Sequence, residues 1–280
     1  MLPAGHWQTI LDFLQERYPK VHVSDWLSRM KKGEVVDENG HALNPASPYR
    51  AGTHIFYYRE VESEIRIPFP ERIIHQDEHI LVIDKPHFLP VIPSGRFLRE
   101  TLLVRLKKNG NWQNLVPLHR IDRETAGIVL FSHNPMTRGE YALLFQNRTV
   151  NKLYEALAPV NPVLSFPLTR RSRIVRGEPF FRMKEVAGRS NTETSIDFVR
   201  EMAGGALYQL HPVTGRKHQI RIHLAAAGIP IFNDRLYPDL RDTTNDDFSN
   251  PLRLLARALS FKDPITGQER CFESERKLMA

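Results

Sequence analysis

Residues 118–132, LHRIDRETAGIVLFS, place a charged loop directly before the apolar run Ala126–Phe131. A short apolar run bounded by polar residues is typical of a buried strand. A carboxylate at Asp122, between Arg120 and Arg123, is a poor choice for packing unless it faces a ligand or pairs with a cation. Two interpretations remain open from these residues: Asp122 is a turn or capping residue paired with an arginine, or it is a functional carboxylate.

A second informative stretch is residues 211–234, HPVTGRKHQIRIHLAAAGIPIFND. Its alternation from His218 to His223 predicts a strand with Arg221 between two isoleucines. Because a buried arginine requires a partner, we expect Asp122 to pair with it and to stay ionised; a purely structural salt bridge is the alternative. The two histidines would point to opposite faces of such a strand with no cysteine near them, so we predict no metal site.

The rest of the chain from residue 68 mixes strand-like and helix-like segments without regular alternation. We expect helices in residues 100–108 and 139–146, and strands in residues 79–86, 126–131, 152–157, 207–210, 219–224 and 256–261. This mixture predicts an α+β fold with a mixed, mostly antiparallel sheet over residues 68–280.

The first 60 residues predict a small separate module. Helical spacing runs through residues 9–32 and is interrupted at Pro19. Asn39-Gly40 is a hairpin-turn signal between short strands. We therefore expect an αα-β module at residues 1–60, followed by a charged linker at residues 59–67.

Composition narrows the class of protein. The chain has 280 residues, 41% of them apolar, and a formal net charge of +7. This balance suits a polyanionic partner without proving one. The single cysteine, Cys271, rules out a disulfide framework and a cysteine-based zinc site. Since there is no apolar run of about 20 residues and no signal-peptide pattern at the N-terminus, we expect a cytoplasmic protein with no membrane span.

The two stretches together resemble one enzyme family. LHRIDRETAGIVLF resembles the HRLD-x-x-T-S-G-L-L-L signature of RluA-type pseudouridine synthases, and GRKHQIRIHLAAAGIPIFNDRLY resembles that family's GRTHQIRVH-x-x-x-x-G-x-P-I-x-G-D-x-x-Y block. Weaker similarities at DEHILVIDKPHFLPVIPS, NKLYEAL and PLRLLARALSFKDPITGQERCFES follow in the family's order, so that the resemblance covers about residues 70–275. The chain departs from the pattern at Ala126, Lys217 and Asn233, where serine, threonine and glycine are usual.

The resemblance implies an isomerase that converts uridine to pseudouridine in RNA without cofactor or metal. Asp122 then corresponds to the catalytic aspartate at the ribose, and Arg221 to the arginine that pairs with it. Tyr154 corresponds to an active-site tyrosine that stacks on the base and is a candidate proton acceptor; its local pattern alone favours the alternative, a half-buried strand aromatic. His119 and Arg120 lie beside the aspartate, and Arg120 is placed to fill the space that a flipped base leaves.

Further RNA contacts are expected from basic residues. The second block supplies Arg216, Lys217, His218 and His223. Residues 170–189 hold 7 Lys and Arg against 2 Asp and Glu, with Phe180 and Phe181 among them. This composition predicts a protruding RNA-binding ribbon, including Arg170, Arg171 and Arg173; a solvated basic hairpin is the alternative.

The N-terminal module resembles the small RNA-binding domain named after ribosomal protein S-four. Residues 1–64 hold 7 Lys and Arg against 9 Asp and Glu. RNA binding by this module would therefore require a local basic patch such as Arg29, Lys31 and Lys32. The alternative is that the module only positions the rest of the chain. With this module we expect ribosomal RNA as the substrate, transfer RNA as the second choice, and a monomer. The competing functions are a non-catalytic RNA-binding factor that keeps the fold and an N-glycoside hydrolase.

Overall fold

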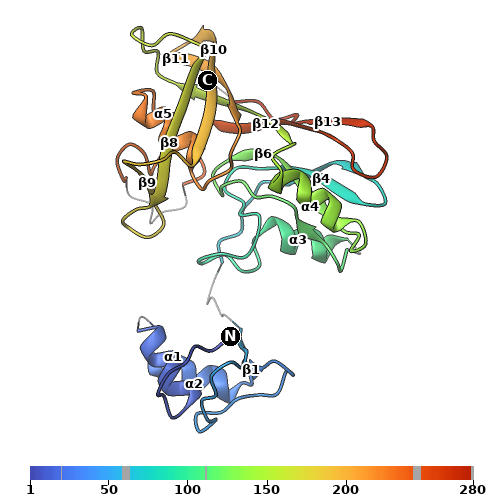
Figure 1. Cartoon of the computed structure of the whole chain (residues 1–280), viewed down its shortest axis with the longest axis vertical. Coiled ribbons are helices and arrows are strands. Elements are labelled where there is room, and N and C mark those ends of the chain that lie inside the picture. The colour runs from blue at the N-terminus through green and yellow to red at the C-terminus, as the bar shows by residue number, and fades with distance from the viewer. Residues whose placement is uncertain (20, 59–63, 111, 242–246, 279–280) are drawn as a thin grey trace. The chain divides into compact units, whose positions relative to one another are not determined.

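A computed structural model describes residues 1–19, 21–58, 64–110, 112–241 and 247–278 of the chain. It divides into two compact units, Met1–Glu62 and Ser63–Ala280 (Figure 1). Part of the predicted linker, residues 59–63, lies outside the described residues. No helix in the described part of the chain combines the length and apolarity that crossing a bilayer requires.

The N-terminal unit contains two helices and a two-stranded sheet: α1 (Ile10–Arg17), α2 (Val23–Lys31), β1 (Val35–Asp37) and β2 (Ile55–Tyr57). Thr9 and Asp12 form a capping box that starts α1. Trp26 of α2 is fully buried, and the described members of its core belong to this unit. The predicted hairpin is partly wrong, because β1 pairs with β2, whereas the turn at Asn39-Gly40 returns the chain only to a single bridge between Val36 and Ala42.

In its described residues, the second unit combines three helices with an 11-stranded sheet, which confirms the α+β prediction. The helices are α3 (Leu102–Asn109), α4 (Arg138–Gln146) and α5 (Gln219–Ala226). The strands are β3 (Arg72–Gln76), β4 (Ile80–Lys85), β5 (Val116–Pro117), β6 (Ala126–Ser132), β7 (Asn151–Ala158), β8 (Leu168–Arg176), β9 (Met183–Val186), β10 (Thr192–Met202), β11 (Gly205–Pro212), β12 (Leu254–Lys262) and β13 (Glu269–Glu273).

The sheet order is β3-β4-β6-β12-β7-β11-β10-β8-β9, with β13 paired to β12 and β5 to β6. Only the β6–β12 contact is parallel among the pairs of described strands. Every residue of β4 and β6 is buried, because alternate side chains enter different cores. Leu81 and Val129 share one core with α3 residues, whereas Val82 and Leu130 share the other with Tyr141 of α4.

The central strand β12 brings the two predicted site segments together. Ala256 of β12 is in register with Gly127 of β6 on one side and with Tyr154 of β7 on the other. A Cβ atom at Gly127 would lie 2.2 Å from the Ala256 carbonyl oxygen, and its φ is +113°. Glycine is therefore required for this close strand approach, which places Tyr154 near the loop that precedes β6.

The segment from Gln219 to Leu224 was predicted as a strand, and this prediction is wrong. It forms α5, in which every residue from Gln219 to Leu224 is buried. A helix buried on all sides has no polar stripe at the 3.6-residue period, and its polar residues here alternate by chance like those of a strand. The other predicted strands, and both helices predicted beyond residue 68, are present within a few residues of their expected ends.

Candidate active site

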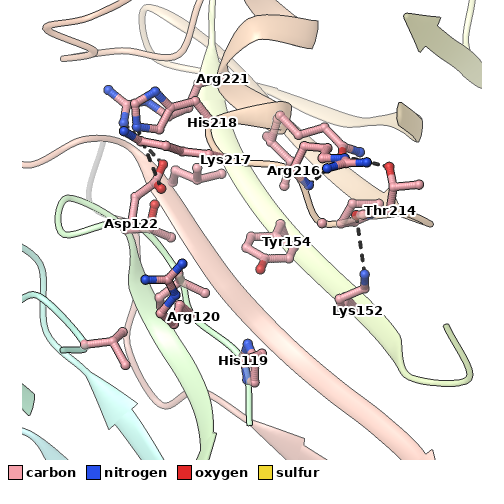
Figure 2. A pocket seen from close by; sticks show the side chains of 18 of the residues that line it. His119, Arg120, Asp122, Lys152, Tyr154, Thr214, Arg216, Lys217, His218 and Arg221 are labelled. Atoms are coloured by element: carbon pink, nitrogen blue, oxygen red, sulfur yellow. Dashed lines mark hydrogen bonds and ion pairs between the residues drawn. The ribbon is translucent and has the colours of Figure 1, made fainter. Parts of the chain in front are cut away.

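A cavity of about 640 Å³ opens in the second unit, a size that suits a nucleotide-sized ligand. Three segments line most of it: the loop before β6 (residues 119–125), the start of β7 including Tyr154, and the segment that leads from β11 into α5 (residues 212–221). Figure 2 shows their side chains converging on one space. The sequence resemblance had pointed to these segments, and the strand order explains why they meet.

Asp122 lies at this cavity and contacts Arg221. The distance from Arg221 Nη1 to Asp122 Oδ2 is 3.2 Å, so the expected ion pair is present. The Arg221 side chain is 1% exposed, whereas that of Asp122 is 22% exposed. The arginine is therefore part of the interior, and the carboxylate keeps an open side toward the cavity.

Arg221 is itself fixed by a second carboxylate. Its Nε and Nη2 donate to the two oxygens of Asp234 at 2.8 and 2.6 Å, in the bidentate geometry that suits a guanidinium. Glu124 Oε2 lies 4.0 Å from Nη1. Burial would lower the pKa of Arg221, but Asp234, Asp122 and Glu124 outweigh it and raise that pKa. Burial likewise opposes ionisation of Glu124, yet Arg221 and Arg123 lower its pKa to about 2.

His218 is the N-cap of α5 and has a left-handed backbone, with φ of 58°. Its Nε2 lies 3.9 Å from Asp122 Oδ1, and its Nδ1 is 2.8 Å from the Tyr237 hydroxyl. Burial lowers the pKa of His218 to about 4 although Asp122 opposes this effect, so the ring is neutral at pH 7. His218 stands directly before the first turn of α5 and Arg221 lies within that turn, so both side chains reach Asp122; the predicted strand would have placed them on opposite faces.

Tyr154 forms the wall of the cavity beside Asp122 (Figure 2). Its half-buried ring packs against the core formed by β7, β11 and α5. Burial, and then the Asp122 charge, raise the pKa of Tyr154. The hydroxyl therefore stays protonated at neutral pH, which disfavours the expected role as a proton acceptor and leaves the ring as a stacking surface.

His119 and Arg120 both line the cavity, as expected, but the His119 side chain is fixed by its contacts and the Arg120 side chain is exposed. His119 Nε2 accepts a hydrogen bond from the Leu130 amide at 3.0 Å, and the ring stacks on Phe145 with centroids 4.7 Å apart. Burial lowers the pKa of His119 to about 3. Arg120 is exposed at the cavity, so of the two it is the side chain that can move into vacated space.

The remaining expected RNA contacts are spread over the unit. Arg216 and Lys217 line the cavity, and Lys217 Nζ donates to the Phe181 carbonyl at 2.8 Å. Arg170 pairs with Glu185, and Arg171 with Glu193. Arg173 is exposed on β8 outside the cavity lining. The ribbon β8–β9 is present, and its turn carries Phe180 with 83% exposure.

His223 was expected to contact RNA, and the structure contradicts this. Its ring is fully buried and lies within 3.1 Å of the hydroxyl groups of Ser172, Thr192 and Thr194. Burial lowers the pKa of His223 to about 4. It therefore fastens α5 to the base of the ribbon. Among the described residues, no group of three or more His, Cys, Asp or Glu side chains is arranged to hold a metal ion.

The sequence of residues 79–226 matches the RNA pseudouridylate synthase family. This match spans more than half of the chain and includes Asp122, Tyr154 and Arg221. The chain belongs to the RNA pseudouridine synthase family. Its members are isomerases, so an enzyme of this class carries the cavity described above.

Individual relatives agree with this assignment. An uncharacterised RNA pseudouridine synthase from Synechocystis is 30% identical over 81% of this chain and 79% of its own. The dual-specificity RNA pseudouridine synthase RluA from Pasteurella multocida is 31% identical over 69% of this chain and 88% of its own. The structure of human RNA pseudouridylate synthase domain containing 4 matches with a TM-score of 0.56 and 26% identity, covering 74% of this chain and 88% of that one.

Two supporting groups of the synthase site were missed from the sequence. Asp234 was not assigned as a partner of Arg221, although a buried guanidinium with five donors needs more than one acceptor. Lys85 was not considered; its Nζ donates to the carbonyls of Pro86, Leu89 and Arg123 at 2.9, 2.7 and 3.1 Å. Burial lowers the pKa of Lys85 to about 7. This buried amine ties the proline-rich loop after β4 to the loop that carries Asp122.

Proposed function

We propose that this RNA pseudouridine synthase uses Asp122 at the ribose of a flipped uridine in structured RNA, with ribosomal RNA as its substrate. The carrying observation is that Asp122 is the one carboxylate among the described cavity-lining residues, and that Arg221 holds it from behind. A nucleotide must leave its stack to reach such a site.

The reaction suits this arrangement. The bond between uracil N1 and ribose C1′ breaks, the Asp122 carboxylate attacks C1′ or stabilises its developing positive charge, and uracil leaves as a delocalised anion. The base turns, a bond forms between C5 and C1′ while the aspartate departs, and the proton lost from C5 is balanced by one gained at N1. Because the leaving base carries its own charge, a second acidic carboxyl group is unnecessary.

Tyr154 and Arg221 have separate parts in this proposal. Tyr154 offers a protonated aromatic wall on which the base stacks and along which it turns. Arg221 remains a cation throughout and orients the Asp122 carboxylate, which stabilises the charges that develop at the ribose. Arg120 is placed to occupy the stack that the base has left.

Replacing Asp122 tests the proposal. Asp122→Asn keeps the shape of the side chain and removes its charge, so pseudouridine formation should fall by at least about 1,000-fold while RNA binding is retained. Product is measured by mapping pseudouridine in RNA incubated with each protein. Asp239→Asn, at an exposed position outside the cavity lining, is the matched control. If the Asp122 variant kept full activity, the assignment of the catalytic group would be wrong.

Ribosomal RNA as substrate is supported by the similarity of the N-terminal unit to the S-four module and by the basic charge of the rest of the chain. Pseudouridine maps of ribosomal and transfer RNA from cells with and without this protein test it. A site lost only from ribosomal RNA supports the proposal. A site lost only from transfer RNA would assign the second candidate substrate instead.

A further inference from the structure

The cavity is also lined by cationic side chains that do not hold Asp122. Figure 2 shows Lys152 beyond Tyr154, with the tyrosine between it and Asp122. Arg148 lines the same cavity from the turn after α4. The catalytic roles argued above use neither Lys152 nor Arg148, so their presence in the cavity needs another explanation.

Lys152 is held in an unfavourable environment. Its side chain is half-buried at the start of β7, and Nζ reaches only the Thr214 carbonyl, at 3.4 Å. Burial, and then the nearby Arg148 charge, lower the pKa of Lys152. Neither residue forms an ion pair with a carboxylate in the part of the chain that the structure describes. Two cations that line one cavity without an anion are stabilised by a negatively charged ligand.

Arg148 occupies a backbone position that disfavours arginine. It follows the C-cap of α4 with φ of 58°, and the Thr149 and Arg148 amides donate to the Leu144 and Phe145 carbonyls at 3.0 and 3.3 Å. This is the Schellman arrangement, in which glycine is strongly preferred at the position of Arg148. The Arg148 backbone is strained and its side chain lines the cavity, which indicates that this position holds arginine for its side chain and not for the turn.

We propose that Arg148 and Lys152 bind a backbone phosphate of the RNA strand next to the flipped uridine. The inference rests on the proposal that the cavity takes a flipped nucleotide. A phosphodiester carries one negative charge and exposed oxygens that both cations can contact. Held on the far side of Tyr154 from Asp122, the phosphate would fix the strand while the base turns against the ring.

The test uses the full-length variants Arg148→Gly, Lys152→Gln and their combination, with binding measured in the Asp122→Asn background to prevent turnover. Each single change should weaken RNA binding about 10-fold, and the double variant should make the salt dependence of binding shallower by about one ion. In the active background, KM for RNA should rise while the rate at saturating RNA changes less than about twofold. Lys107→Gln, an exposed lysine of α3 outside the cavity, is the control.

Thermal unfolding separates this role from a structural one. Arg148→Gly relieves the left-handed strain, so the variant should melt at the same temperature as the parent or higher. Weaker RNA binding with undiminished stability supports the phosphate site. Unchanged affinity and salt dependence in the double variant would overturn it, and so would a loss confined to the rate at saturating RNA. Neither result would touch the Asp122 assignment, which depends on product formation by the Asp122 variant.

Discussion

At the scale of single residues, the site depends on the Arg221 guanidinium, which contacts both a buried carboxylate, Asp234, and a carboxylate that faces the cavity, Asp122. Asp234 is 1% exposed and takes two hydrogen bonds from Arg221, whereas Asp122 takes one and faces the cavity. The buried pair holds Arg221 in place, and the remaining Nη1 is thereby aimed at Asp122. Asp234 is therefore a positioning residue that acts on Asp122 through Arg221.

Asp234→Asn should damage both stability and activity. The change leaves the buried Arg221 with less compensating charge, which should cost about 3 kcal/mol of unfolding free energy. A small displacement of Arg221 and Asp122 should lower the rate at saturating RNA about 100-fold. Chemical denaturation and pseudouridine formation measure the two effects, with Asp239→Asn as the exposed control.

A variant that lost stability but kept the wild-type rate would show that Arg221 does not need Asp234 to orient Asp122. Measuring activity well below the unfolding midpoint keeps this outcome separate from simple loss of folded protein. The two readouts thus distinguish a positioning role from a purely structural one.

The pair of Asp122 and Arg221 could be predicted because an arginine in an apolar run requires a partner and the family motif supplied one. Asp234 could not be assigned with the same argument, because nothing in the sequence IFND shows that its aspartate comes back into contact with Arg221 of α5. Asn233 illustrates the same limit. Its φ is 61° and its side chain donates to the Pro251 carbonyl at 3.0 Å, so it keeps the left-handed turn that the usual glycine would form.

At the scale of elements, α5 is held to the base of the β8–β9 ribbon by a buried neutral histidine. His223 has a pKa of about 4 in the folded protein and about 6.5 as an ordinary histidine. At pH values between 4 and 6.5, His223 is therefore protonated in the unfolded chain and neutral in the folded chain. The contribution of the neutral His223 to the free energy of unfolding is complete above about pH 6.5 and is lost as the pH falls through 4.

His223→Gln should remove part of this acid sensitivity. The amide retains hydrogen-bonding groups toward Ser172 and Thr194 but does not titrate. Between pH 6.5 and 4.5 the wild type should lose about 2 kcal/mol more unfolding free energy than the variant. Urea titrations at each pH measure this difference, and His211→Gln, which removes an exposed histidine from β11, is the control. Parallel losses in wild type and variant would contradict the proposed buried, neutral state.

Helices with one exposed face and strands with continuous apolar runs were predicted better than the helix that is buried on all sides. The charged and apolar positions of residues 100–108 and 139–146 identified α3 and α4, and the apolar runs identified β4 and β6. In α5 the helical period is hidden because Gln219, Arg221 and His223 are all buried and satisfied by tertiary partners. Their hydrogen-bond partners lie in β10, β8 and the segments around the helix, which no local pattern reveals.

At the scale of the whole molecule, each unit has an apolar core of its own. The N-terminal core draws on residues between Leu2 and Tyr57, and the cores of the second unit begin at Ile67. Glu64 belongs to the second unit, because its carboxylate accepts hydrogen bonds from the Arg99 and Glu100 amides at 2.8–2.9 Å. A cut before Glu64 therefore separates the cores and keeps the hydrogen bonds that Glu64 accepts.

The fragment Ser63–Ala280 should consequently fold and catalyse without the N-terminal unit. The last turn of α2 in the N-terminal unit carries Arg29 and Lys31. If these cations contact phosphates, removal of the unit should weaken binding to a structured RNA about 10-fold. Turnover of saturating RNA should be unchanged, because every residue lining the cavity lies in the fragment. Calorimetry, RNA binding and pseudouridine formation test the three statements against the full-length chain. An unfolded fragment would show that the units depend on a shared core, and unchanged affinity would leave the N-terminal unit as a positioning appendage.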